Sequence, residues 1–185
     1  MAHTPQQTII EFLSAPVATS SSPLILTGDD TTQKGTQRTS GGLGAVASTI
    51  QFLKEREVEH FYACIVAFSD VKGQAWEMVC LVQQSENSDW VLRNGSGGAP
   101  RTSRQKEGGS QETKAEIIAG PGTEGGFFAG GYIVGSNANN VTRVHLIDQD
   151  GVMLEDVVSE NDDGRILFVT GNDIKLPVHV EIVES

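Results

Sequence analysis

Basic residues are scarce in this 185-residue chain, and their scarcity bears on the partners that it can bind. Thirteen lysines and arginines stand against 24 aspartates and glutamates, for a formal net charge of -11. A nucleic-acid surface needs a patch of Lys and Arg, and only Arg101, Arg104 and Lys106 lie close together in the sequence. The composition therefore argues against DNA or RNA as a partner.

Long apolar runs are also missing. No run approaches the roughly 20 residues that a membrane-spanning helix requires. The first ten residues, MAHTPQQTII, lack the basic segment followed by an apolar segment that marks a secretory signal. These absences predict no membrane span and, by default, a cytoplasmic location, with export left open.

Cysteine occurs only twice, at Cys64 and Cys80. With no further cysteine and no suitably spaced histidine, neither a metal site nor any other cofactor is predicted. If the hairpin between 61–68 and 75–82 turns about Lys72, residues whose numbers sum to 144 face each other, and Cys64 lies opposite Cys80. The two then form either a possible disulfide or a pair of small buried thiols, and a cytoplasmic location favours the thiols.

Recognisable catalytic signatures are absent too, and no catalytic residue is predicted. Gly95–Pro100 resembles the nucleophile segment Gly-Asp-Ser-Gly-Gly-Pro of chymotrypsin-like proteases, but Asn94-Gly95 replaces the Gly-Asp pair. The upstream His60 lies too close in sequence for a catalytic triad built on a double barrel. A glycine-rich strand exit explains the segment better.

Two further sets of residues suggest metal chemistry and are better explained as parts of strands and turns. Asp148–Gly151 resembles part of a calcium-binding loop. If Gly151 is aligned with the invariant glycine of such a loop, Leu146 takes the first ligand position, where a carboxylate is required, so we predict a hairpin turn instead. His145 and His179 alternate with apolar residues, which places them on the polar faces of strands near Glu181.

The first half of the chain predicts helices followed by an antiparallel meander. Thr4 to Gln7 has the form of a capping box with Pro5 at the first helical position, and an amphipathic helix follows. A second helix is predicted from about Gly42 to Glu57. Its buried face would carry Val46, Ile50 and Leu53. Strands at 61–68, 75–82 and 90–93 complete this unit.

The second half reads as strands and turns only. The segment 96–114 is rich in Gly, Ser and charge and is predicted to be flexible. After it, strands are predicted at 127–134, 141–147, 152–158, 166–170 and 178–183. We therefore predict an α+β unit over 1–95, with N-terminal helices on a meander, and a small antiparallel β-sandwich-like unit over 115–185.

The strand pattern of the second half resembles that of uncharacterised bacterial β-rich proteins. The likeness is carried by Trp90–Gly98, Gly125–Gly131, Val144–Ile147, Asp150-Gly151 and Pro177–Glu181. No activity is attached to those proteins, so the resemblance implies no functional residues.

Two candidate sites follow from the first half. The first is an anion site at the start of the predicted second helix, formed by Ser40, Gly41 and Gly42. The alternative is that Ser40 only caps this helix. An apolar pocket would be lined by one set of side chains: Tyr62, Phe68, Trp76, Met78, Trp90 and Arg93.

Because no catalytic group stands at a recognisable spacing, the leading prediction is a non-catalytic protein-interaction or structural module that contacts a protein partner. Its contact surface would be sandwich loops or an exposed strand edge. The alternative is a small-molecule-binding domain or weak enzyme that takes a small apolar ligand in the N-terminal pocket.

Overall fold

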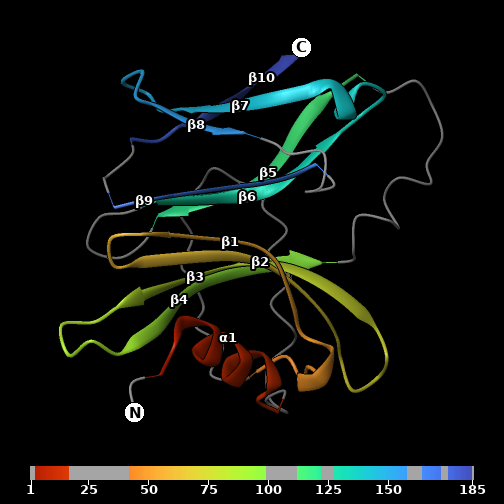
Figure 1. Cartoon of the computed structure of the whole chain (residues 1–185), viewed down its shortest axis with the longest axis vertical. Coiled ribbons are helices and arrows are strands. Elements are labelled where there is room, and N and C mark those ends of the chain that lie inside the picture. Colours follow the sequence, from red (N-terminus) through yellow and green to blue (C-terminus); the bar gives the residue numbers. More distant parts are fainter. Residues whose placement is uncertain are drawn as a thin grey trace.

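The computed structural model describes residues 3–16, 42–98, 112–121, 127–157, 164–171 and 175–184. Figure 1 shows these residues in four layers, a helix followed by three stacked antiparallel sheets. The elements are α1 (Pro5–Ser14), β1 (Gln51–Val58), β2 (Phe61–Ser69), β3 (Ala75–Gln84), β4 (Trp90–Gly98), β5 (Lys114–Pro121), β6 (Phe127–Val134), β7 (Val141–Ile147), β8 (Met153–Val157), β9 (Arg165–Thr170) and β10 (His179–Glu184), with short 3-10 turns η1 (Ala47–Thr49) and η2 (Ala138–Asn140). The antiparallel sheets of the predicted α+β fold are confirmed, but the described residues contain one short α-helix and not the predicted pair.

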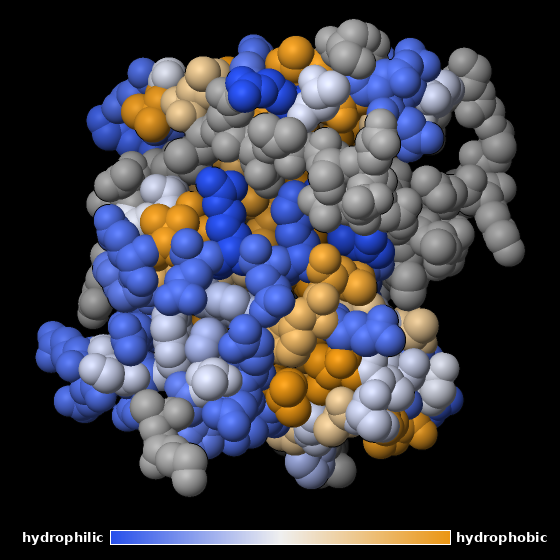
Figure 2. All heavy atoms as spheres, in the orientation of Figure 1, coloured by the Kyte–Doolittle hydropathy of each residue, from blue (hydrophilic) through white to orange (hydrophobic). Residues whose placement is uncertain are grey.

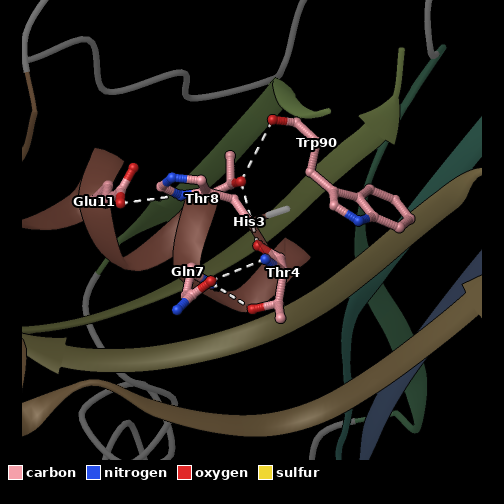
Figure 3. A network of polar contacts seen from close by, with 6 residues as sticks. All are labelled: His3, Thr4, Gln7, Thr8, Glu11 and Trp90. Carbon is pink, nitrogen blue, oxygen red and sulfur yellow. Dashed lines mark hydrogen bonds and ion pairs between the residues drawn. The ribbon is translucent and has the colours of Figure 1, made fainter. Parts of the chain in front are cut away.

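Helix α1 begins where the sequence predicts. The Thr4 hydroxyl accepts a hydrogen bond from the Gln7 amide at 3.2 Å, and the Gln7 side chain accepts one from the Thr4 amide at 3.0 Å. The Thr8 hydroxyl also donates to the carbonyl of Trp90 on β4 at 3.4 Å (Figure 3). The helix thus rests on the first sheet through its buried residues Ile9 and Leu13 and through this bond. Within the described residues, no helix has the length and apolar character needed to cross a membrane.

The first sheet has the order β1-β2-β3-β4 and contains the predicted meander. Strands β2 and β3 pair so that Cys64 faces Cys80 and Phe68 faces Trp76. The predicted register of this hairpin is therefore confirmed.

The predicted second helix is wrong. Residues 47–49 form the turn η1, and Gln51–Val58 form β1, the edge strand next to β2. The register shifts between Phe52 and Lys54, so Leu53 is the extra residue of a β-bulge. Phe52 packs on the core beneath α1, whereas Leu53 packs on the core on the other side of the sheet. The apolar residues therefore serve two faces of a strand and not one face of a helix.

The segment predicted to be flexible begins too early. Strand β4 continues to Gly98, and the pairing places Gly97 opposite Met78. A Cβ on Gly97 would lie 2.3 Å from the carbonyl oxygen of Glu77, so this glycine permits a close backbone approach inside the sheet. Strand β5 starts at Lys114 and was not predicted. Residues 99–111 lie outside the described part of the chain.

The second half forms two stacked sheets, with orders β5-β6-β9 and β10-β7-β8. Strands β6 and β7 have the predicted bounds, and β8, β9 and β10 lie within one or two residues of theirs. A core that includes Phe127, Phe168 and Val144 fills the space between the two sheets.

The first and second sheets pack face to face through a separate core, to which β2 contributes Phe61, β6 contributes Phe128 and β9 contributes Leu167. Strand β1 lies beside β9, where the Lys54 amine donates to the carbonyl of Arg165 and the Arg56 guanidinium to the carbonyl of Leu167, each at 3.2 Å. These side chains occupy carbonyls along the outer edge of β9.

Candidate interaction surface

Five of the six predicted pocket residues gather on one face of the first sheet, and Arg93 lies on the other face. Tyr62, Phe68 and Met78 are buried, and Trp76 and Trp90 pack against them, in the same core as Ile9 and Leu13 of α1. Phe68 and Trp76 stack with ring centroids 6.5 Å apart. The sheet brings these five residues together, and they pack against one another and against α1.

Polar contacts fix two members of the predicted set. The Tyr62 hydroxyl donates to Glu55, which also accepts from the Gln6 side chain of α1 at 3.0 Å. Burial first, and then the bond to Glu55, raise the pKa of Tyr62 well above its ordinary value. The Arg93 side chain instead donates to Gln83 at 3.2 Å. Tyr62 is thereby a neutral donor that joins the first sheet to α1.

Cys64 and Cys80 are both buried and both free thiols. The hydrogen bond with Cys80 and then burial raise the pKa of the Cys64 thiol well above its ordinary value. The low thiolate fraction that results makes Cys64 a poor nucleophile.

The helix start expected to form the anion site is absent. Gly42 is followed by η1 and β1, and its amide donates to the carbonyl of Pro16 at 3.2 Å. A Cβ on Gly42 would lie 2.2 Å from the carbonyl oxygen of Ala15 and 2.5 Å from that of Phe12, so the backbone at the end of α1 lies against this position. Ser40 and Gly41 lie outside the described residues.

The turn between β7 and β8 is built around the buried carboxylate of Asp148, as the sequence predicts for a hairpin. Its Oδ1 accepts from the amides of Asp150 at 2.9 Å and Val152 at 2.8 Å, and its Oδ2 from the amide of Lys175 at 3.2 Å. The Lys175 amine forms an ion pair with Asp150. One carboxylate therefore joins this turn to the segment that leads into β10.

Three apolar side chains are exposed beside this carboxylate. Val152 is 52% exposed, Met153 51% and Leu176 53%. We call these three residues the apolar tip. The amide of Val152 itself donates to Asp148, and Leu176 directly follows Lys175, whose amide also donates to Asp148. The turn therefore holds the backbone of both residues in place. Figure 2 shows apolar side chains reaching the surface at the β7–β8 end of the uppermost layer.

The turn between β2 and β3 has the same construction. Asp70 Oδ1 accepts from the amides of Lys72 at 2.9 Å and Gln74 at 2.8 Å, and Gly73 has a φ of 77° where Gly151 has 78°. Among the described residues 70–74 of this turn, Val71 is the one large apolar residue, and it is 74% exposed. This second turn is therefore a natural control for the apolar tip.

Acidification is expected to weaken the turn at Asp148. Burial alone would raise the pKa of this carboxyl, but the amides of Val152, Lys175 and Asp150 hold it below its ordinary value of 3.8. Because the folded pKa is the lower one, the carboxylate contributes stability that is present above about pH 4 and lost as the pH falls through the folded pKa.

Urea unfolding of the wild type and of Asp148→Asn at several pH values between about 6 and 2.5 measures this contribution. The wild type should be the more stable protein at neutral pH, and the difference should shrink below about pH 4. A difference that stays constant across this range would contradict the role of the ionised carboxylate.

The outer face of the third sheet carries the predicted polar residues. Glu181 on β10 faces His145 on β7, and His179 lies two residues from Glu181, with its Nε2 atom 3.8 Å from the carboxylate. Among the described residues, no group of three or more His, Cys, Asp or Glu side chains is arranged to hold a metal ion.

No family model, curated protein or solved structure matches this chain. The resemblance to bacterial β-rich proteins therefore stays a prediction, and the surface has to be interpreted from its own geometry.

The apolar tip was not predicted from the sequence. The predicted strand 152–158 contains both Val152 and Met153, and alternation along a strand would bury one of them. Both follow the turn Asp148–Gly151, and both are exposed. Two apolar residues directly after an Asp-x-x-Gly turn are the signal that would have found them.

Proposed function

We propose that this protein is a non-catalytic protein-interaction module whose contact surface is the apolar tip. The observation that carries the proposal is the exposure of Val152, Met153 and Leu176 next to a turn that one buried carboxylate holds. Exposed apolar clusters with polar neighbours are typical of contact sites between proteins, and rigid clusters lose less entropy on binding. A partner with a small apolar pocket fits a tip of this size.

The charged surroundings of the tip support the same proposal. Lys175 and Asp150 form an ion pair beside it. A polar rim around a small apolar centre is the common arrangement of transient protein interfaces. The alternative of a small apolar ligand in the N-terminal unit has less support, because Tyr62, Phe68 and Met78 are buried in a core with α1.

The test compares protein partners captured from a cell extract by three forms of the full chain. The tip variant Val152→Ser/Met153→Ser removes two exposed apolar side chains, and Val71→Ser removes one from the matched turn. We expect at least one protein that the wild type and Val71→Ser retain equally and that the tip variant retains about tenfold less, the loss expected from hot-spot residues.

Equal retention by all three forms would overturn the proposal. Unfolding curves of the variants check the folded state, and both should match the wild type closely because the replaced side chains are exposed.

A further inference from the structure

Strand β10 is an edge strand of the third sheet. It pairs with β7 on one side, and no described strand pairs with its other side. Its inward residues Val180 and Ile182 pack against the core beneath, and its outward residues His179 and Glu181 are exposed. An edge of this kind has backbone groups that can pair with another strand.

Three other edge strands in the described part of the chain, β9, β1 and β4, have features that hinder such pairing. On β9, the carbonyls of Arg165 and Leu167 already accept hydrogen bonds from Lys54 and Arg56. Strand β1 contains the bulge at Leu53. Strand β4 has a register shift of its own and contacts α1 through the carbonyl of Trp90. Strand β10, by contrast, contains no bulge. The register between β10 and β7 shifts once, and the extra residue there is Thr142 of β7.

We propose that the edge of β10 that faces away from β7, where no described strand pairs, binds β10 of a second copy of this chain, antiparallel about a two-fold axis at Val180. This inference goes beyond the proposed function, because it concerns a different surface and a different partner.

The charges on the outer face select the register. Two copies related by a two-fold axis keep their inner and outer faces aligned only when facing residue numbers add to an even total. With Val180 on the axis, His179 of each copy faces Glu181 of the other, and an opposite-charge cross-strand pair forms on each side whenever the imidazole is protonated. One step further along, Glu181 would face a second Glu181, and like charges directly opposite are destabilising.

Apolar residues agree with the same register. With Val180 on the axis, Val178 faces Ile182 on the inner side, so the apolar row that packs on the core continues across both copies. On the outer side, the exposed Val183 faces Pro177 of the second copy. With Ile182 on the axis, by contrast, Glu181 would face Val183, and no opposite-charge pair would form. Charge and apolar matching therefore select one register.

The association should be weak. A single added strand contact covers less than the roughly 800 Å² per partner of a standard interface, and each copy has a formal charge of -11, so the copies repel each other. We expect a dissociation constant on the order of 100 μM at physiological salt.

Sedimentation equilibrium of the full chain from about 10 μM to 1 mM tests the pairing and its register. At a pH that protonates His179, Glu181→Lys places two cations opposite each other across the axis. His179→Glu places two carboxylates there, and each variant should then weaken association about fivefold or more. The double variant His179→Glu/Glu181→Lys places opposite charges across the axis again, and it should associate at least as tightly as the wild type.

The control Glu57→Lys makes the same charge change on the exposed face of β1 and should bring no comparable loss. A protein that is monomeric at 1 mM would overturn the proposal, as would single variants that associate like the wild type or a double variant that stays weak. The tip variant Val152→Ser/Met153→Ser leaves β10 intact and should still dimerise. Loss of partner capture and loss of dimerisation are thus separate results.

Discussion

Replacing Glu77 with alanine is expected to lower the free energy of unfolding by about 3–5 kcal/mol. Glu77 on β3 and Arg165 on β9 form an ion pair between the first and second sheets, with the Arg165 Nε atom 3.1 Å from the carboxylate. The side chains are only 6% and 17% exposed. The Arg165 guanidinium also lies 5.8 Å from the centre of the Tyr132 ring. The variant would leave a largely buried cation without its carboxylate, which is the costly way to lose such a pair.

A double variant distinguishes the effect of the charges from the effect of the side-chain volume between the sheets. Glu77→Leu/Arg165→Met removes both charges and keeps apolar bulk between the sheets, so it should recover most of the lost stability and unfold within about 1–2 kcal/mol of the wild type. Urea unfolding followed by circular dichroism measures all three proteins. A double variant as unstable as Glu77→Ala would show that the specific hydrogen-bonded geometry, and not the loss of the carboxylate charge beside Arg165, dominates.

The hairpin of β2 and β3 could be predicted residue by residue because local signals agree there. Both strands are apolar runs, and the turn between them, Asp70 to Gln74, places a glycine at a positive φ. A short turn fixes the register of a hairpin, so Cys64 had to face Cys80 once the turn was located. The predicted capping box of α1 depends on equally local chemistry, the contact between Thr4 and Gln7.

Strand β1 could not be predicted in this way because its environment is not local. Val46, Ile50 and Leu53 repeat at helical spacing, and the charged residues after them favour helices. In the structure, the charges of Lys54 and Arg56 reach the carbonyls of β9, whose residues lie more than 100 positions away. Tertiary contacts of this kind override local propensity, and the sequence pattern contains no trace of them.

Glycines caused the second error, since they are typical both of flexible segments and of crowded sheets. Gly97 lies against the Glu77 carbonyl, and a Cβ on Gly131 would lie 2.1 Å from the carbonyl oxygen of Glu116 on β5. On the opposite face of β6, a Cβ on Gly130 would lie 2.8 Å from Val79 of the first sheet. The sequence shows where the glycines are, but it does not show which neighbouring atoms leave no room for a side chain. The ion pair of Glu77 and Arg165, 88 residues apart, was missed for the same reason.

The stacking of the first sheet on the second predicts that the two halves of the chain unfold together. Phe128 of β6 is buried in the core that joins these sheets, and Phe128→Ala is expected to cost about 3–5 kcal/mol. Both tryptophans of the chain, Trp76 and Trp90, lie on the far side of the first sheet, beneath α1. Tryptophan fluorescence therefore reports on a part of the molecule that Phe128 does not touch, and its urea midpoint should fall with the mutation.

Phe127→Ala is the matched control, because Phe127 is equally buried but points into the core between the second and third sheets. If all three sheets form one cooperative unit, both variants should lower the tryptophan midpoint by similar amounts. A loss with Phe128→Ala alone would mean that the third sheet unfolds separately. An unchanged tryptophan midpoint with Phe128→Ala, beside an earlier transition by circular dichroism, would mean that the first sheet and α1 are stable without the second half. The shared core would then position the two halves without coupling their folding.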